Sequence, residues 1–334
     1  MVRYDHLDVH FLNVGHGDCT IIHHPKSEKR KEGRVSIIDI NDWDHLKPEE
    51  TDQFIAGLSS YLQQQSSSGY FEKQISEEEY AEEYLDDPVE YYQEAFSGLK
   101  NKVWRFISTH PDMDHLAGLK QFHEEIGFDV MWDTPHSKEM DTGDGWYEKF
   151  NREDWYRYEA IRGGETDVNN INPRRESQKN FWEQDNIQIL HPSHSFVEEI
   201  DEQSSGYNDA SYVLKLTHGN QAMLLPGDIE EDAWEEILDY WGPDVLSDVN
   251  ILKASHHGRK SGFHREAIEE MDPDLVVVSV GNKDESDGYG LYWDACGDDT
   301  NIISTRQYGT VRAVSTGRRT MVSCAEPDGI FDLP

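Results

Sequence analysis

Short runs of alternating or continuously apolar residues recur along the chain, and polar or glycine-containing turns separate them. Runs of this kind that are rich in β-branched residues are typical of strands. Strands are predicted over residues 7–14, 19–22, 35–40, 102–108, 187–190, 211–217, 221–226, 248–254, 275–280, 311–315 and 319–323. Helices are predicted over 116–126, 230–240 and 262–271. Because polar loops follow the carboxyl ends of the inner strands, we expect an α/β (α+β) layered protein with its site at those ends.

Two stretches depart from this order. Residues 41–100 hold 15 Asp or Glu against 3 Lys or Arg, with a Gln-Gln-Gln-Ser-Ser-Ser run in the middle. Helices are predicted there over 49–64 and 76–97, so we interpret the stretch as an acidic helical insertion on the surface. Residues 129–186 contain several Trp and Tyr with little periodicity, and we expect a loop-rich insertion over the active-site face. The whole chain, 1–334, is interpreted as one domain with these two insertions.

Composition narrows the class of protein. With 334 residues and 36% hydrophobic residues, the chain can bury a substantial core. The formal net charge of −37 repels polyanions at long range and argues against broad nucleic-acid binding, unless a basic patch is segregated around the site. The three cysteines show no CxxC spacing, and the first residues are too polar for a signal peptide. No apolar run approaches the ~20 residues of a membrane span. We therefore expect a cytoplasmic protein without a membrane anchor.

The clearest chemical motif is His-Pro-Asp-Met-Asp-His at 110–115, directly after the predicted strand 102–108. Imidazole and carboxylate groups together suit Zn²⁺, Mn²⁺ or Fe²⁺. A tight loop can direct His110 and Asp112 toward one cation and Asp114 and His115 toward a neighbouring one. The alternative is a polar loop that caps the next helix, which would account for Asp114 alone.

Two further motifs follow predicted strands. Asp228 lies in a Pro-Gly-Asp turn after strand 221–226, where an isolated aspartate is often only a turn residue. Beside the first motif, we predict that it bridges two cations. Strand 248–254 leads into Ser-His-His-Gly, in which one of His256 and His257 can bind metal. The other can donate to an oxyanion or protonate a leaving group.

Residues 251–265 contain four basic side chains and no acidic one, in a chain that is otherwise strongly acidic. We interpret this segment as a rim that contacts phosphate, because Lys and Arg bind phosphate oxygens. The alternative is a surface patch that balances neighbouring acids. The basic residues are Lys253, Arg259, Lys260 and Arg265.

Taken in order, five segments resemble the metallo-β-lactamase superfamily, in its ComEC-type branch. They follow that branch's order and approximate spacing, and they cover most of the chain outside the two insertions. The segments are FLNVGHGDCTII (11–22), STHPDMDHLAGL (108–119), NDASYVLKL with AMLLPGDI (208–229), LKASHHGRKSG (252–262) and LVVVSVGN (275–282). The resemblance implies an αββα sandwich of two facing sheets with helices outside and metals at one edge.

Carried over residue by residue, the resemblance implies a set of metal ligands. His257 is preferred to His256 as a ligand because it directly precedes glycine, although the two assignments can be exchanged. Asp18 is expected to support a ligand or brace its loop, and His16 to contact substrate. The predicted catalytic residues are Asp114, His256 and Lys253. The predicted metal ligands are His110, Asp112, Asp114, His115, Asp228 and His257, with Asp209 as a substitute ligand.

This chain departs from the superfamily pattern at three places. Asp112 stands where the superfamily usually has histidine, and Asp209 lies where a further histidine ligand is usual. Residues 283–287 replace an expected His-Pro. The half-site of His110 and Asp112 is therefore predicted to be oxygen-rich and to hold its metal weakly or to prefer Mn²⁺.

The expected activity is metal-dependent hydrolysis of phosphodiester bonds, by a nuclease or by a hydrolase of small phosphodiesters, with Zn²⁺ or Mn²⁺ at about two ions per chain. The same metal centre could instead hydrolyse another ester, a lactone or a thioester. A third alternative is a catalytically degraded metal-binding protein whose acidic or aromatic insertion docks a protein partner. A phosphate-containing substrate is expected, with nucleic acid as one option and no membrane partner.

Overall fold

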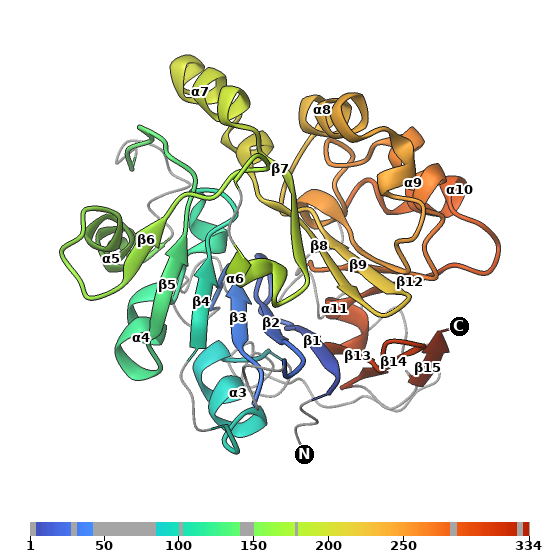
Figure 1. The fold of residues 1–334 in the computed structure, drawn as a ribbon, viewed down its shortest axis with the longest axis horizontal. Helices are drawn as coiled ribbons and strands as arrows, with labels where there is room; N and C mark the ends of the chain where they lie inside the picture. The colour runs from blue at the N-terminus through green and yellow to red at the C-terminus, as the bar shows by residue number, and fades with distance from the viewer. Residues whose placement is uncertain are drawn as a thin grey trace, which may run out of the picture.

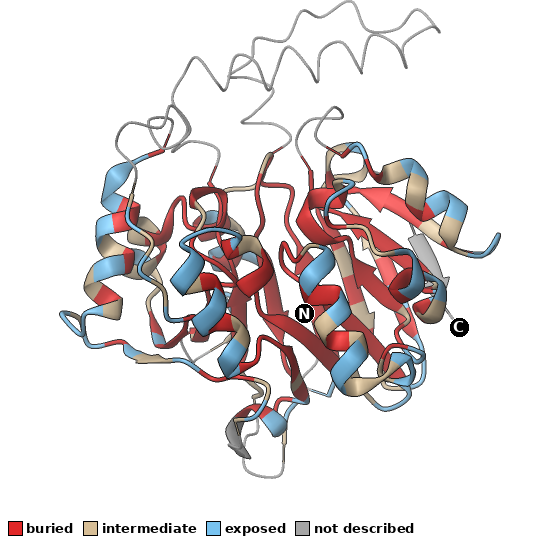
Figure 2. Cartoon of the chain, turned by 90° about the horizontal axis from the view of Figure 1, so that it is seen from above, coloured by how far each residue is buried: buried red, intermediate tan, exposed pale blue. Residues whose placement is uncertain are grey.

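Two β-sheets form the centre of the protein, and helices lie along their outer faces (Figure 1). The computed structural model describes residues 5–27, 32–42, 85–99, 103–140, 150–177, 180–280, 286–325 and 330–333. In Figure 2 the strands are almost wholly buried, whereas the helices alternate between buried and exposed residues. The predicted αββα sandwich is confirmed.

Within the described residues, the first sheet has nine strands. In spatial order they are β15 (Ile330–Leu333), β14 (Thr320–Cys324), β13 (Val311–Ser315), β1 (Leu7–Phe11), β2 (Thr20–His23), β3 (Val35–Ile38), β4 (Val103–Ile107), β5 (Phe128–Trp132) and β6 (Asn169–Ile171). Strand β1 pairs antiparallel with both β2 and β13, so segments from the two ends of the chain meet in this sheet. Strands β3 to β6 run parallel to one another.

The second sheet has six strands among the described residues. Their order is β12 (Asn301–Ser304), β11 (Leu275–Val278), β10 (Ile251–Lys253), β9 (Gln221–Leu225), β8 (Val213–His218) and β7 (Ile187–His191). Strands β9 to β12 are parallel neighbours, and β7, β8 and β9 are antiparallel. Both sheets are therefore mixed, and each has a parallel part whose carboxyl ends share one edge.

Helix starts follow local sequence signals. Before the first of them, the side chain of Asp87 accepts hydrogen bonds from the backbone N–H groups of Val89 and Glu90, at 2.7 and 3.2 Å, and Pro88 occupies the first helical position. The described helices are α3 (Pro88–Ala95), α4 (Leu119–Glu125), α5 (Arg152–Arg162), α6 (Asn180–Glu183), α7 (His194–Gln203), α8 (Glu231–Trp241), α9 (Arg265–Met271), α10 (Tyr289–Ala295) and α11 (Thr305–Tyr308).

Three hydrophobic clusters separate the four layers. One lies between the sheets, one beneath α3, α4 and α5, and one beneath α8, α9 and α10. Strand β11 shows how the sequence produces this. Leu275 and Val277 enter the cluster between the sheets, whereas Val276 and Val278 enter the cluster beneath the helices. An unbroken apolar run is needed because an inner parallel strand is buried on both faces.

The structure differs from the sequence expectation within 129–186. Strand β5 pairs with β4, strand β6 pairs with β5, and α5 packs on the same sheet, so much of this stretch extends the sandwich. The periodicity is hard to recognise because β6 has three residues and α5 buries mainly Trp155, Tyr158 and Ile161 among charged neighbours. Of the helices predicted in 41–100, the one over 49–64 lies outside the described residues, and the one over 76–97 overlaps α3.

The sandwich brings distant loops to one edge. The loops after β3, β4, β9 and β10 leave the carboxyl ends of parallel strands, and the loop before β2 reaches the same edge. Gly17, in that last loop, has φ +134°, and a Cβ there would lie 2.4 Å from the backbone oxygen of Asp114. Asp18 N donates to the same oxygen at 3.2 Å. Only glycine permits the opening loop to approach the 110–115 loop this closely.

Candidate metal centre

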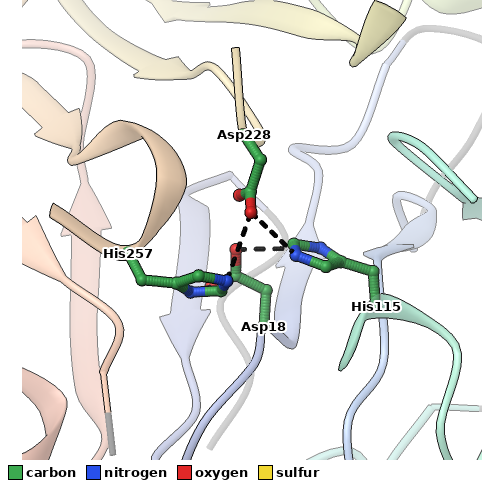
Figure 3. Close-up of side chains that lie close together, drawn as sticks. All are labelled: Asp18, His115, Asp228 and His257. Atoms are coloured by element: carbon green, nitrogen blue, oxygen red, sulfur yellow. Dashed lines mark hydrogen bonds and ion pairs between the residues drawn. The ribbon is translucent and has the colours of Figure 1, made fainter. Parts of the chain in front are cut away.

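Four buried side chains converge at this edge of the sandwich, one from each of four loops (Figure 3). Each offers one potential ligand atom, and these four atoms lie within 4.8 Å of one another. All four residues are at most 2% exposed. We call this group the four-residue cluster, and its members are Asp18, His115, Asp228 and His257.

Asp39 orients the first histidine. Its Oδ2 accepts a hydrogen bond from Nδ1 of His115 at 2.8 Å, and its two oxygens also accept from the backbone N–H and hydroxyl of Thr109, each at 2.7 Å. Because a carboxylate can only accept, Nδ1 of His115 carries the proton. Nε2 of His115 then faces Oδ2 of Asp228 at 3.2 Å. A carboxylate behind a histidine in this way is the usual arrangement at metal sites.

The second histidine is aimed by an unusual backbone. His256 and His257 have φ values of +48° and +54°, in the left-handed region that L-residues rarely adopt. This bend directs Nδ1 of His257 to the carbonyl oxygen of Ser279 at 3.1 Å. Nε2 then lies 3.2 Å from Oδ2 of Asp228 and 3.5 Å from Oδ2 of Asp114. Both histidines thus present Nε2 toward Asp228.

The donor set fits a divalent cation. Oδ1 of Asp228 is buried and has no hydrogen-bond partner among the described residues, which is costly unless a ligand satisfies it. Burial alone would lower the pKa of His257, but the nearby Asp228 and Asp18 carboxylates outweigh it and raise the pKa to about 10. A negative potential of this strength also favours a cation, and mixed imidazole and carboxylate ligands suit Zn²⁺ or Mn²⁺.

Asp18 and Asp114 approach the histidines from different sides. Oδ1 of Asp18 lies 3.9 Å from Nδ1 of His257, which faces Ser279, and its Oδ2 lies 2.5 Å from the buried ammonium of Lys253. Asp114 instead lies on the Nε2 side of His257 and 3.6 Å from Nε2 of His16. The sequence predicted a supporting role for Asp18 and a ligand role for Asp114, and the structure brings both carboxylates to the site.

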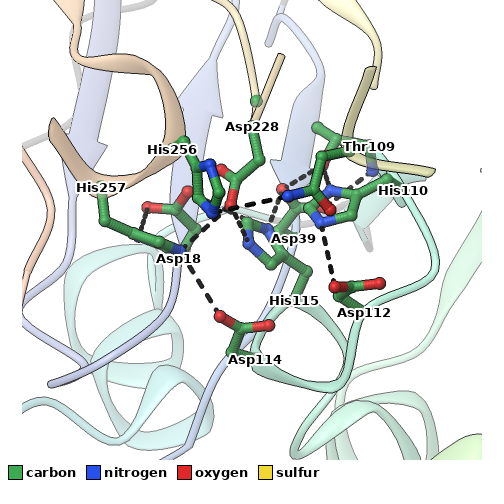
Figure 4. Close-up of polar contacts among 12 residues, drawn as sticks. Asp18, Asp39, Thr109, His110, Asp112, Asp114, His115, Asp228, His256 and His257 are labelled. Atoms are coloured by element: carbon green, nitrogen blue, oxygen red, sulfur yellow. Dashed lines mark hydrogen bonds and ion pairs between the residues drawn. The ribbon is translucent and has the colours of Figure 1, made fainter. Parts of the chain in front are cut away.

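The other predicted ligands lie outside the four-residue cluster. The ring of His110 packs against that of His115 with centroids 4.3 Å apart and the planes tilted by 58°, and its Nε2 is 3.9 Å from Oδ2 of Asp112 (Figure 4). Asp112 is paired with Lys138. The carboxylate of Asp209 accepts a hydrogen bond from the backbone N–H of Glu230 at 2.6 Å. The ligand roles of these three residues and of Asp114, which also lies outside the four-residue cluster, remain predictions.

His256 lies beside the cluster in a polar environment of its own. Its Nδ1 is 2.9 Å from the hydroxyl of Ser261 and 3.0 Å from Oε1 of Glu230. Its Nε2 is 3.3 Å from the Arg259 guanidinium and 3.4 Å from the Asn208 amide nitrogen. The sequence singled out the histidine but not Glu230 or Ser261, whose contact with it depends on the fold of the loops after β9 and β10.

The predicted basic rim is divided by the fold. Lys253 is buried against Asp18, and Arg265 forms an exposed pair with Glu269 along α9 at 3.1 Å. Arg259 and Lys260 remain on the loop that follows His257. Of residues 283–287, which replace the branch's expected His-Pro, 283–285 lie outside the described residues and Ser286 and Asp287 lie within them.

Comparisons with known proteins give short sequence matches. The chain is 32% identical over 74 residues to ComE operon protein 3 of Bacillus subtilis. This match covers 22% of this chain and 9% of that protein. The chain is also 29% identical over 100 residues to Recombination protein 2 of Haemophilus influenzae. This match covers 30% of this chain and 11% of that protein. The chain is distantly homologous to these ComEC-type proteins. The matched segments span less than a third of this chain and only a small part of either relative.

No protein-family profile matches the chain. Among solved structures, Igni18, a metallo hydrolase of Ignicoccus hospitalis, covers 91% of this chain and 98% of its own, with 10% identity and a TM-score of 0.44. CmlA, a diiron β-hydroxylase of Streptomyces venezuelae, covers 90% of this chain and 48% of its own, with 13% identity and a TM-score of 0.37. No helix within the described residues combines the length and apolar character needed to cross a bilayer.

Proposed function

We propose that this chain is a metal-dependent hydrolase of phosphodiester bonds. The observation that carries the proposal is the four-residue cluster, in which both histidines direct Nε2 toward Asp228 and Oδ1 of Asp228 is buried without a hydrogen-bond partner among the described residues. A divalent cation held there would supply a nucleophilic water at neutral pH and stabilise developing negative charge. The order of the five segments that resemble the ComEC-type branch supports the same reaction class.

The residues around the cluster have distinct tasks in this proposal. Asp39 holds the ring of His115 so that Nε2 faces the centre. Lys253 balances the charge of Asp18 inside the protein, where an isolated carboxylate would be unfavourable. Glu230 and Ser261 orient His256 through its Nδ1. These contacts preorganise the site before substrate arrives.

Recognition of the phosphoryl group is assigned to the polar side chains on the other side of His256. Arg259 and Asn208 both direct N–H groups toward Nε2 of that histidine, so donors are gathered at one point beside the cluster. A guanidinium matches the geometry of phosphate oxygens. The net charge of −37 favours a small phosphodiester over a long duplex, because the acidic surface repels a polyanion.

The test is hydrolysis by purified chain reloaded with Mn²⁺ or Zn²⁺. The substrates are bis-p-nitrophenyl phosphate, p-nitrophenyl acetate and a simple lactone. We expect phosphodiester turnover that falls about 100-fold or more in Asp228→Asn, because removing a ligand should cost at least what removing a supporting partner costs. Asp294→Asn, which changes an exposed aspartate on α10, is the matched control.

Each result separates the alternatives. Turnover of the acetate or lactone with no turnover of the phosphodiester would replace the proposed reaction class by ester or lactone hydrolysis. Equal activity in wild type and Asp228→Asn would show that the cluster is not the active centre. Metal binding without hydrolysis of any substrate would favour the metal-binding partner protein. We also propose a cytoplasmic location for this chain and a protein partner for its insertions.

A further inference from the structure

The second half of the predicted metal centre is occupied by contacts of the chain itself. The sequence predicts that His110, Asp112 and Asp209 hold a second cation beside the four-residue cluster. In the structure each of these side chains has protein partners instead. The elements that supply these partners indicate whether this half-site can bind a metal ion.

Asp112 is paired with the ammonium group of Lys138. Lys138 lies on the segment that follows β5, and its Nζ also lies 5.3 Å from the centre of the Tyr207 ring. The hydroxyl of the preceding residue, Ser137, donates a hydrogen bond to Oδ1 of Asp201 at 2.8 Å. This bond holds the segment after β5 against α7. The side chains of Lys138 and Asp112 are 16% and 25% exposed, so solvent reaches the pair only in part. The lysine is therefore held in place by the fold.

Asp209 serves the start of a helix. Its Oδ1 accepts from the backbone N–H of Glu230 at 2.6 Å, and the N–H of Ala233 also bonds to its carboxylate. These are N–H groups at the beginning of α8, which have no partner within the helix. Because Asp209 satisfies them, moving its carboxylate to a cation would leave the helix start uncapped.

His110 is then the remaining candidate ligand of that half-site. Its Nδ1 lies 3.0 Å from the Thr109 hydroxyl, and its Nε2 lies 3.9 Å from Asp112. Even with Asp228 as the predicted bridging ligand, one imidazole and a carboxylate already paired with an ammonium make a poor site for a divalent ion, which normally has three or more protein ligands free to bind it.

We propose that this chain holds a single divalent cation, at the four-residue cluster, and that the Lys138 ammonium supplies the positive charge on the His110–Asp112 side. The inference rests on the proposed function for the existence of the first cation. An ammonium can stabilise an anionic oxygen, but unlike a metal ion it cannot act as a Lewis acid. Lys138 is accordingly a positioning residue for an anionic substrate, and it excludes a second cation by repulsion.

The experiment counts ions without relying on catalysis. Chelator-treated chain is titrated with Mn²⁺ in a calorimeter, and the loaded protein is examined by electron paramagnetic resonance. We expect one tight ion in the wild type and the six-line spectrum of an isolated Mn²⁺. Lys138→Arg and Asp112→Asn should also bind one ion, since the first keeps the charge and the second removes no ligand of the occupied site.

Lys138→Ala is the informative variant. Loss of the ammonium exposes the charge of Asp112, and we expect a second, weaker Mn²⁺ to bind at excess metal. Lys120→Ala is the matched control, because Lys120 forms an exposed pair with Glu153 at 3.2 Å and should leave the count at one. Circular dichroism of each variant confirms that the fold is retained.

Three results would overturn the inference. Two tight ions in the wild type, or a spin-coupled Mn²⁺ spectrum, would restore the binuclear centre. A fall in ion count in Asp112→Asn would make that residue a ligand. A count of one in folded Lys138→Ala would remove the excluding role of the lysine. Failure of the proposed function looks different, because one ion would still bind while no phosphodiester is hydrolysed.

Discussion

Nδ1 of His115 donates a hydrogen bond to Oδ2 of Asp39 over 2.8 Å, and this contact determines which imidazole nitrogen faces the metal centre. Asp39 lies at the end of β3 and has φ +54°. Its second oxygen is occupied by the backbone N–H of Thr109, at the start of the metal loop. The Asp39 carboxylate therefore both positions the loop after β4 and determines the tautomer of His115.

The first prediction concerns this pair. Asn tolerates the left-handed backbone, so Asp39→Asn should fold, but it removes the negative charge behind His115. We expect the affinity for Mn²⁺ or Zn²⁺ to fall about 10–100-fold, as is typical when the partner of a ligand histidine is lost. Competition with a metallochromic chelator measures the affinity. An affinity equal to that of the Asp294→Asn control would contradict the role given to Asp39.

The second prediction distinguishes the two carboxylates that flank the histidines. Asp114 lies 3.5 Å from Nε2 of His257, whereas Asp18 lies 3.9 Å from its Nδ1 and is paired with Lys253. Although Asp18 belongs to the four-residue cluster, Lys253 already neutralises its carboxylate, whereas Asp114 faces Nε2 of His257. We therefore expect Asp114→Asn to lose more cation affinity than Asp18→Asn, because Asp114 completes the ligands around the ion beside His115, Asp228 and His257. Calorimetric titration of both variants gives the order. The reverse order would make Asp18 the ligand and Asp114 the supporting group.

The third prediction concerns an ion pair that joins the sheets away from the metal. Arg105 of β4 donates to Oδ2 of Asp185, which precedes β7, at 2.9 Å, and Arg34 approaches the same oxygen at 3.2 Å. Arg105 is fully buried and Asp185 is 2% exposed. Asp185→Asn leaves a buried guanidinium without its counter-charge, and we expect a loss of about 3–5 kcal/mol in the free energy of unfolding. Urea denaturation at pH 7 measures it, and a loss below about 1 kcal/mol would be inconsistent with this pair.

The same pair predicts how stability depends on pH. Burial alone would raise the pKa of Asp185, but His24, Arg105 and Arg34 outweigh it and lower the pKa below its ordinary value. A carboxyl whose pKa is lower in the folded state stabilises the fold above its unfolded pKa of about 3.9, and this contribution is lost as pH falls through the folded value. The difference in unfolding free energy between wild type and Asp185→Asn should be constant from pH 7 to about pH 5 and shrink below about pH 4. A difference that grows with acid would have the wrong sign.

The fourth prediction compares two glycines. Gly17 has φ +134° and meets the backbone oxygen of Asp114, so Gly17→Ala should destabilise the protein by about 1–3 kcal/mol and weaken cation binding. Gly290 lies in α10, has ordinary backbone angles, and has no atom within 4 Å of an added Cβ. Gly290→Ala should instead stabilise by up to about 1 kcal/mol. Thermal unfolding of both variants in chelator and in Mn²⁺ provides the comparison.

The sequence was sufficient where a local pattern carries the structure. Strand β11 is recognisable because an inner strand buried on both faces must be apolar throughout, and the loops after β4, β9 and β10 are recognisable because ligands follow strand ends. The ordered motifs carried His115, Asp228 and His257 to one site, where the structure brings them together. These are properties of short segments, and one sequence is enough to display them.

Other features depend on contacts between distant segments. Nothing near Lys138 distinguishes it from a surface lysine, and its pairing with Asp112 depends on how the segment after β5 crosses the metal loop. Asp39 carried no motif of its own, because its partners Thr109 and His115 lie in the loop after β4, at sequence separations of 70 and 76. The sequence could not show whether Asp209 binds metal or accepts hydrogen bonds from the chain, because the N–H group that it accepts from lies at the start of α8.

The four-residue cluster draws on residues from Asp18 to His257, and no two of its members share a loop. During synthesis, the cluster cannot form until β10 and the turn after it have left the ribosome and the two sheets have met. A cation that binds there connects the sheets as a cross-link would, and it adds to stability in proportion to the logarithm of its free concentration above the dissociation constant. Metal loading therefore reports that the chain has been made at least as far as His257 and that the two sheets have met.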